Sequence, residues 1–221
     1  RSDGGSAPTD EPDEAAAGSA GTDTLAPPPD AGACDDIAEA ACLLPWPNDR
    51  FTRADGSAVT GRRVDLPADG MPTTVDGVSI DPTEWNRNDG YAPVSQLIAV
   101  IPGLDPEASG LPPVTDIGAG SDNLIVYDVT AGEAVPVWAE LDANAPAPDT
   151  APLLIVPATA LAEGHTFVVG LEGLVTTDGS AVEPSEGFQA QVDDPDALAV
   201  ATFEALAEQG FATEDLDLAW S

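Results

Sequence analysis

His165 is the only histidine in the chain, so any catalysis that uses histidine must use this residue. Nucleophilic hydrolysis needs a serine or cysteine beside a base, and an acid that orients the base. His165 follows Glu163-Gly164 at the start of an alternating apolar stretch, a pattern typical of a strand-edge residue. The chain contains no Gly-x-Ser-x-Gly turn, the usual support of a hydrolase serine. We therefore expect His165 to be structural, and we expect no catalytic residue in this chain.

Two other kinds of reactive site are not expected either. A zinc site needs several Cys or His ligands at close spacing, and Cys34 and Cys42 have only the distant His165 to join them. A phosphate-binding loop needs a glycine-rich turn between a strand and a helix, whereas Gly118-Ala119-Gly120 precedes an expected strand. The sequence therefore predicts no cofactor, with calcium as the one alternative.

One polar block has the composition of a calcium site. Calcium binds several carboxylate and carbonyl oxygens, and residues 80–90 offer oxygens at every second or third position around turns. The spacing does not match the helix-flanked calcium loop. The alternative is that Asp and Asn side chains shape turns here and that Arg87 pairs locally. The candidate ligands are Asp81, Glu84, Asn86, Asn88 and Asp89.

The two cysteines, Cys34 and Cys42, are close enough in sequence to form a disulfide. A straight helix would hold them about 12 Å apart, and a disulfide needs Cα atoms within about 7 Å. A bridge therefore requires a turn between them. It would stabilise the fold by roughly 2–3 kcal/mol and would indicate an oxidising compartment. Two buried free thiols are the alternative.

The charge balance excludes several partners. Forty acidic residues face six basic ones, all of them arginine, for a net charge of −34. Nucleic acids and anionic membranes both require a basic face. Such acidity favours solubility, and it reflects either a solvated surface suited to a saline habitat or divalent-cation binding. We expect no nucleic-acid partner, and no stretch of the chain is long and apolar enough for a transmembrane segment.

The distribution of apolar runs and turn residues along the chain predicts a mostly β fold. Residues 1–33 contain Leu25 as their only large apolar side chain and predict a disordered acidic tail or linker. Beyond residue 42, short runs rich in Val and Ile alternate with Gly, Pro and Asp-Gly turn signals, which is typical of an antiparallel sandwich or barrel. The expected strands are 63–66, 94–101, 123–129, 134–141, 152–156, 165–171 and 187–192.

One helix is expected near the end, at residues 195–209. Asp194 would cap it, Pro195 suits its first position, and Gly210 would end it. Its apolar face would consist of Ala199, Phe203, Leu206 and Ala207. After it, residues 217–220 look like the start of another strand, an unusual terminus for a domain. We therefore expect the parent protein to continue past Ser221.

Two stretches resemble the same family. Residues 42–52, which include Leu44-Pro45-Trp46-Pro47-Asn48-Asp49, resemble the opening of the N-terminal region of bacterial virulence-factor-type lipases. Residues 214–221, ending in Leu218-Ala219-Trp220-Ser221, resemble the strand that closes that region. Residues 80–90 resemble a related actinobacterial branch of secreted proteins. The family consists of extracellular lipases and lysophospholipases whose α/β-hydrolase domain lies further on. None of its catalytic residues has a counterpart here.

A third stretch, residues 162–188, is similar to bacterial Ig-like repeats. The shared pattern is a glycine at the edge (Gly164), a Phe-x-Val strand (Phe167-Val168-Val169), a hairpin at Asp178-Gly179 and a closing Phe188. The expected fold is an Ig-like antiparallel β-sandwich with one C-terminal helix. The expected domains are a tail (1–33), a sandwich (34–192, with its Ig-like part at about 145–192) and a segment leading into a missing downstream domain (193–221).

Together these features predict a non-catalytic N-terminal module of a secreted lipase- or esterase-like hydrolase. Its partner would be the downstream catalytic domain of the same polypeptide. The protein would be extracellular or attached to the cell envelope. The main alternative is a stand-alone extracellular Ig-like binding or adhesion module, stiffened by calcium. Another is an enzyme of a kind that the motifs do not reveal.

Overall fold

The computed structural model describes residues 42–118 and 121–221. The predicted tail at 1–33 and Cys34 therefore lie outside the described residues. Among the described residues, nine strands form antiparallel sheets, two α-helices lie near the C-terminus, and four short 3-10 helices connect elements. The predicted mostly-β fold is confirmed. The 3-10 helices are η2 (Asp49–Phe51), η3 (Trp85–Arg87), η4 (Pro148–Thr150) and η5 (Thr213–Asp215).

The first sheet of the sandwich has three strands in the order β3 (Leu97–Val100), β7 (Pro152–Pro157), β6 (Val137–Leu141). Burial alternates along each strand: Leu97 and Ala99 face the core, as do Leu153 and Ile155 of the central strand. This period of two is expected for a sheet with one face on the core and the other toward solvent.

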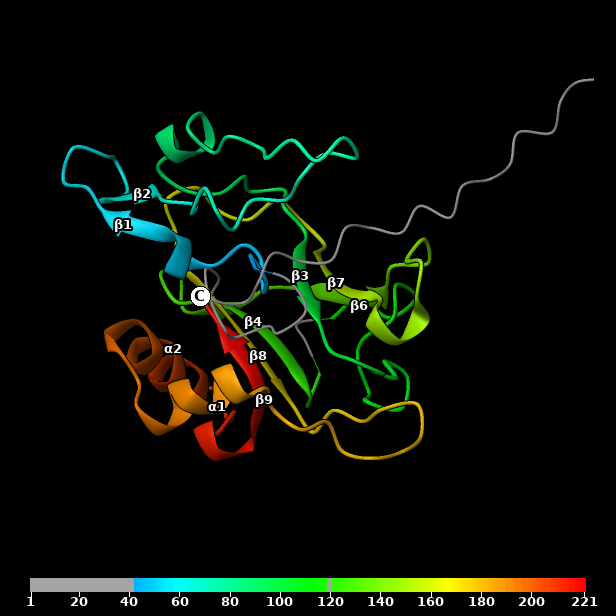
Figure 1. The fold of residues 1–221 in the computed structure, drawn as a ribbon. Helices are drawn as coiled ribbons and strands as arrows, with labels where there is room; N and C mark the ends of the chain where they lie inside the picture. The colour runs from blue at the N-terminus through cyan, green and yellow to red at the C-terminus, as the bar shows by residue number, and fades with distance from the viewer. Residues whose placement is uncertain (1–41, 119–120) are drawn as a thin grey trace, which may run out of the picture.

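The second sheet has four strands in the order β5 (Glu133–Ala134), β4 (Leu124–Asp128), β8 (Phe167–Glu172), β9 (Leu216–Trp220). Here burial is nearly continuous rather than alternating along β4, β8 and β9. The cause is cover on both faces, because the three-stranded sheet lies on one side and the helices on the other (Figure 1). Val-rich runs such as that of β8 match this environment.

Two helices cover the outer face of the four-stranded sheet: α1 (Glu186–Asp193) and α2 (Ala197–Ala207). Phe188 of α1 meets Phe203 of α2 edge to face, with ring centroids 6.1 Å apart. Gly170 of β8 lets α2 approach closely, since a Cβ there would lie 2.9 Å from a Leu206 methyl carbon. Both helices thus belong to the main core.

The helical region corrects two predictions. Residues 187–192, expected as a strand, lie in α1, because Ser185 caps its start by accepting from Phe188 N–H and Phe188 and Val192 share one helix face. The one predicted helix, at 195–209, is the second of two among the described residues, and it spans Ala197–Ala207. It starts at Ala197 because Asp196 rather than Asp194 accepts the free N–H groups of Leu198 and Ala199.

The predicted apolar face of that helix is partly wrong, and the left-handed conformation predicted for Gly210 is confirmed. Ala199, Phe203 and Leu206 are buried as predicted, but Ala207 is exposed and Thr202 takes a buried place. Gly210 follows the helix with a φ of +97°, the left-handed conformation that its position predicted.

The predicted strand 134–141 is two strands in different sheets. Ala134 ends β5, which pairs with β4, whereas Val137 begins β6, which pairs with β7. Pro136 stands between them, and proline has no N–H with which to continue a ladder. The chain therefore crosses from one sheet to the other at this residue.

A smaller layer precedes the sandwich. Strands β1 (Thr52–Ala54) and β2 (Arg62–Val64) form a hairpin, and Phe51, Val64, Leu66 and Met71 make a separate buried cluster beneath it. Trp46 and Tyr91 pack against this cluster, edge to face at 4.9 Å between ring centroids. The layer lies across one end of the two sheets in Figure 1.

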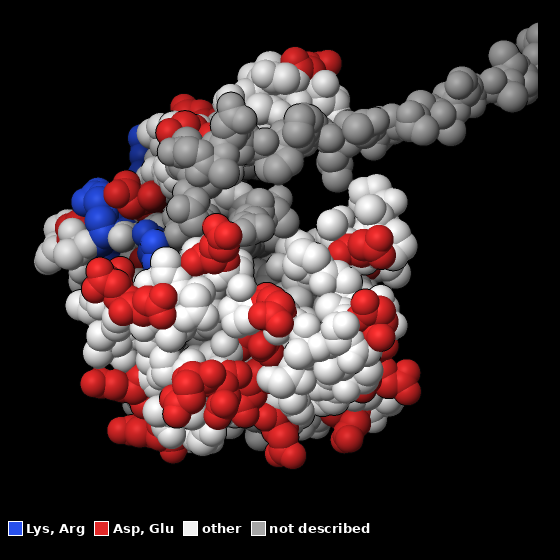
Figure 2. All heavy atoms as spheres, turned by 60° about the horizontal axis from the view of Figure 1, so that its bottom comes forward, with Lys and Arg blue, Asp and Glu red and all other residues white. Residues whose placement is uncertain are grey.

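The charged groups are unevenly distributed. Figure 2 shows acidic side chains over most of the visible face and arginines gathered at one edge. The five arginines of the described residues all lie between positions 50 and 87, in the hairpin layer. Neither helix among the described residues is long and apolar enough to cross a membrane.

Candidate functional site

The opening segment and the last strand meet at one place, although they are far apart in sequence. Asp49 N–H donates to the Ser221 carbonyl at 2.6 Å, and Trp46 exchanges two backbone hydrogen bonds with Ile98 of the neighbouring sheet at 2.8 and 2.7 Å. These contacts fix the Pro-Asn-Asp segment against the C-terminal end of β9. We call this meeting point, residues 46–51 with Ala219–Ser221, the junction.

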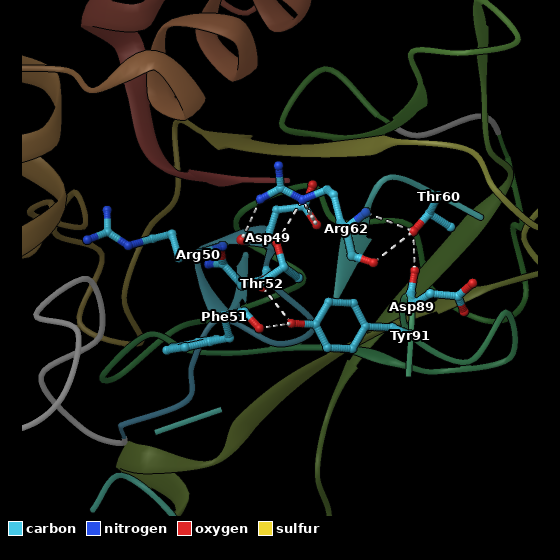
Figure 3. Close-up of polar contacts among 9 residues, drawn as sticks. Asp49, Arg50, Phe51, Thr52, Thr60, Arg62, Asp89 and Tyr91 are labelled. Carbon is cyan, nitrogen blue, oxygen red and sulfur yellow. Dashed lines mark hydrogen bonds and ion pairs between the residues drawn. The ribbon is translucent and has the colours of Figure 1, made fainter. Parts of the chain in front are cut away.

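Asn48 holds the junction in shape. It is 2% exposed, and its Oδ1 accepts from Arg50 N–H at 2.9 Å, which caps the 3-10 helix η2. Its backbone carbonyl accepts from the Tyr91 hydroxyl at 2.7 Å, and that hydroxyl also lies 3.3 Å from the Phe51 carbonyl (Figure 3). Tyr91 thereby ties the junction to the hairpin layer.

Asp49 lies next to Arg62 of β2. The Arg62 Nε donates to Thr52 Oγ1 at 2.7 Å and lies 3.9 Å from Asp49 Oδ1, while its Nη2 donates to the Asp49 carbonyl at 3.2 Å. Burial raises the pKa of the Asp49 carboxyl, and the Arg62 charge opposes this rise. Burial, together with the Asp49 charge, raises the pKa of the Tyr91 hydroxyl as well. In Figure 3 the Arg50 side chain extends away from this network.

A small pocket, partly open to solvent, lies between the junction and helix α2. Its walls combine apolar groups of α2 and β9 with polar groups from Asn48, Arg50, Asp196 and Ser221. Two buried polar atoms of this lining, Asn48 Nδ2 and Ser221 Oγ, have no hydrogen-bond partner in the described part of the chain. Buried polar atoms without partners are costly and rare, so their presence in one pocket marks it as a candidate binding site.

His165 forms an acid–histidine pair with Asp128. Its Nδ1 lies 2.7 Å from Asp128 Oδ2, and the other carboxylate oxygen accepts from Thr130 and Ala131 N–H. A catalytic triad would need a hydroxyl or thiol at the second ring nitrogen. Among residues 42–118 and 121–221, Asp128 is the only side chain that hydrogen-bonds to His165. The pair joins the turn after β4 to the start of β8.

The candidate calcium ligands are engaged in local structure. The Asp81 carboxylate accepts from Thr83 N–H at 2.9 Å and Thr83 Oγ1 at 2.6 Å, and these bonds lower its pKa. Glu84 pairs with Arg87 at 2.9 Å, which is the local pairing weighed as the alternative.

The rest of this block is held by the strand beside it. Asn86 bonds through both ends of its amide to the backbone of Leu66, at 2.8 and 3.0 Å. Asn88 and Asp89 offer backbone carbonyls to Val64 N–H and the Thr60 hydroxyl. In the described part of the chain, no group of three His, Cys, Asp or Glu side chains could hold a metal ion. The calcium site stays a prediction, to be tested by calcium titration against sodium at equal ionic strength.

The predicted Cys34–Cys42 disulfide also stays a prediction, since Cys34 lies outside the described residues. Motif reasoning did not find the pocket. Asn48 followed by Asp49 is a typical start of a short helix, so the sequence could have predicted that Asn48 caps η2. The presence of Asn48 and Ser221 in one pocket could not have been predicted, because it depends on where β9 ends in space. No family model, curated protein or solved structure matches this chain.

Proposed function

We propose that this chain is the non-catalytic N-terminal β-sandwich module of a secreted lipase- or esterase-like hydrolase, whose catalytic domain follows on the same polypeptide. The observation that carries the proposal is the hydrogen bond from Asp49 N–H to the Ser221 carbonyl. It joins the two stretches, 42–52 and 214–221, that resemble the opening and the end of one family's N-terminal region.

The chemistry of the described residues supports a non-catalytic role. Hydrolysis of an ester needs an activated nucleophile and a group that stabilises the oxyanion. The acid–histidine pair of Asp128 and His165 joins two backbone segments. In the described part of the chain, no serine, threonine or cysteine side chain hydrogen-bonds to His165. In the pocket at the junction, the one carboxylate of the described lining is that of Asp196, which accepts from Leu198 and Ala199 N–H as the cap of α2.

The position of the junction suggests what the module does. The carbonyl of Ser221 is bound by the opening segment, and Trp220 is buried in the main core. Polypeptide following β9 would therefore leave the sandwich from a fixed point and in a fixed direction. We infer that the module holds the catalytic domain in a fixed position. That position would be relative to the extracellular partner that the hairpin layer and the acidic surface contact.

A hydrolysis assay tests the non-catalytic part of this proposal. The purified chain is incubated with short- and long-chain p-nitrophenyl esters, beside the variant His165→Ala. We expect both to release nitrophenol at the rate of buffer alone. Release above that rate by the unaltered chain, abolished in His165→Ala, would show that the chain is itself a hydrolase.

A further inference from the structure

We propose that the pocket between the junction and α2 binds a neutral carbonyl group, the amide carbonyl of a peptide, through Asn48 Nδ2 and Ser221 Oγ. The ligand's oxygen would accept hydrogen bonds from both atoms. Each of them is buried and has no hydrogen-bond partner among residues 42–118 and 121–221. A group that supplied the missing acceptor would remove the cost of leaving them unpaired.

The donor character of the site follows from the Asn48 amide. Its Oδ1 already accepts from Arg50 N–H, so the NH2 end is the one left without a partner. An NH2 group only donates, and therefore its ligand must accept. Ser221 Oγ can donate to the same acceptor, because a hydroxyl hydrogen rotates to suit its partner.

Charge decides between a neutral carbonyl and a carboxylate. The lining contains the carboxylate of Asp196 as well as the Arg50 side chain. Asp196 is already used as the cap of α2, where it accepts from Leu198 and Ala199 N–H. The net charge of −34 repels any further anion. A neutral amide satisfies the donors without this penalty.

The size and walls of the pocket indicate a peptide group rather than a whole small molecule. The apolar part of the lining comes from Leu198, Phe203 and Trp220, and the pocket is small and open on one side. Drug-sized ligands need far larger, deeper cavities. The space admits about one water-sized group, such as a carbonyl oxygen, and the open side leaves the rest of a peptide outside it.

The amide could come from two sources with the same chemistry. The first is the polypeptide that follows β9 in a longer parent, which rests on the proposed function. The second is a separate extended peptide. The two sources can be distinguished by whether a small amide probe binds to the longer parent. A carbonyl of the same polypeptide, at high effective concentration, would occupy the pocket and prevent the probe from binding.

A titration followed by NMR tests the proposal. The 15N-labelled chain is titrated with N-acetylglycine N-methylamide, and in parallel with sodium acetate at ionic strength matched by sodium chloride. We expect saturable shifts of the Asn48 side-chain NH2 and of the Leu198 and Ala199 amides with the amide probe only. No saturable shift, or tighter binding of acetate, would overturn the proposal.

Variants locate the binding. Asn48→Asp removes the donor but keeps the oxygen that caps η2, and should abolish binding. Ser221→Ala should weaken binding roughly fivefold, the value of about one neutral hydrogen bond. Val200→Ala, on the exposed face of the same helix, is the matched control and should bind as the unaltered chain does. Equal binding by the unaltered chain and all three variants would overturn the proposal. If Asn48→Asp does not fold, the comparison of Ser221→Ala with Val200→Ala still tests it.

The same probe distinguishes the sources in the protein isolated from its natural source. Loss of probe binding there assigns the carbonyl to the parent's own polypeptide, and retained binding assigns it to a separate peptide. Either result leaves the assay of ester hydrolysis untouched. A failure of the proposed function and a failure of this inference can therefore be told apart.

Discussion

Asp49 and Ser221 are joined by a backbone hydrogen bond of 2.6 Å, which closes the structure from the start of the hairpin layer to the end of the last strand. The bond depends on the shape of η2, and that shape depends on Asn48, whose side chain caps it. The stability of the fold and the position of the C-terminal end of β9 are therefore linked through one buried amide.

Asn48→Ala should lower the free energy of unfolding by about 1–2 kcal/mol, because it removes the cap and leaves the Arg50 N–H without its acceptor. Urea denaturation would measure it, with an unchanged m-value showing that the fold is kept. Thr83→Ala, which removes a hydroxyl from an exposed turn, is the control and should cost much less. An unchanged midpoint for Asn48→Ala would contradict the role given to this residue.

Gly170→Ala should destabilise the protein by about 1–3 kcal/mol, because the new methyl group would collide with Leu206 of α2 in a packed core. Leu206→Ala alone should cost about 2–5 kcal/mol by leaving a cavity. The double variant should cost less than the sum of the two, by about 1 kcal/mol, because the new methyl occupies part of that cavity. Strictly additive costs in denaturant melts would show that α2 does not contact β8 at Gly170.

Glu172→Gln should stabilise the protein at neutral pH and not at low pH. Burial, and then the charges of Asp215 and Asp217, raise the pKa of Glu172 above its ordinary 4.5 in the folded state. The folded state therefore holds its proton to higher pH than the unfolded state, and stability falls as pH rises through this range.

The gain from Glu172→Gln should be under about 1 kcal/mol at pH 7 and should vanish below the ordinary pKa, where Glu172 is protonated in both states. Thermal melts at several pH values would measure it. Glu163→Gln, at an exposed position, controls for the general benefit of removing one charge from an acidic surface. A gain of equal size at all pH values would argue against a raised pKa.

Reduction should lower the melting temperature if Cys34 and Cys42 are bridged, with a loss of roughly 2–3 kcal/mol on the loop-entropy model. Melts with and without dithiothreitol test this, and the double variant Cys34→Ser with Cys42→Ser is the control that should not respond to reductant. Identical melts of the unaltered chain in both conditions would refute the bridge.

Sequence patterns predicted the strands well where local chemistry decides. The Val- and Leu-rich runs of β4 and β8 and the turn residues around them give both type and place. The errors arose where two periodicities compete: residues 187–192 contain few strand-forming side chains, and Phe188 and Val192 stand four apart, a helical spacing. Pro136 was likewise a visible break in what was predicted as one strand.

The site was much less predictable. The polar block at 80–90 drew attention by composition, yet its side chains serve turns and a strand edge, which composition cannot distinguish from a metal site. The junction depends on a contact between residues at opposite ends of the described chain. No spacing rule reports such a contact.

The most direct test of the central claim is to label the protein from its natural source with a fluorophosphonate probe and to measure its intact mass after capture with an antibody against this chain. We predict a polypeptide that extends beyond Ser221 and is labelled at a serine outside these 221 residues. An unlabelled polypeptide that ends at Ser221 would contradict the account and would favour a stand-alone binding module.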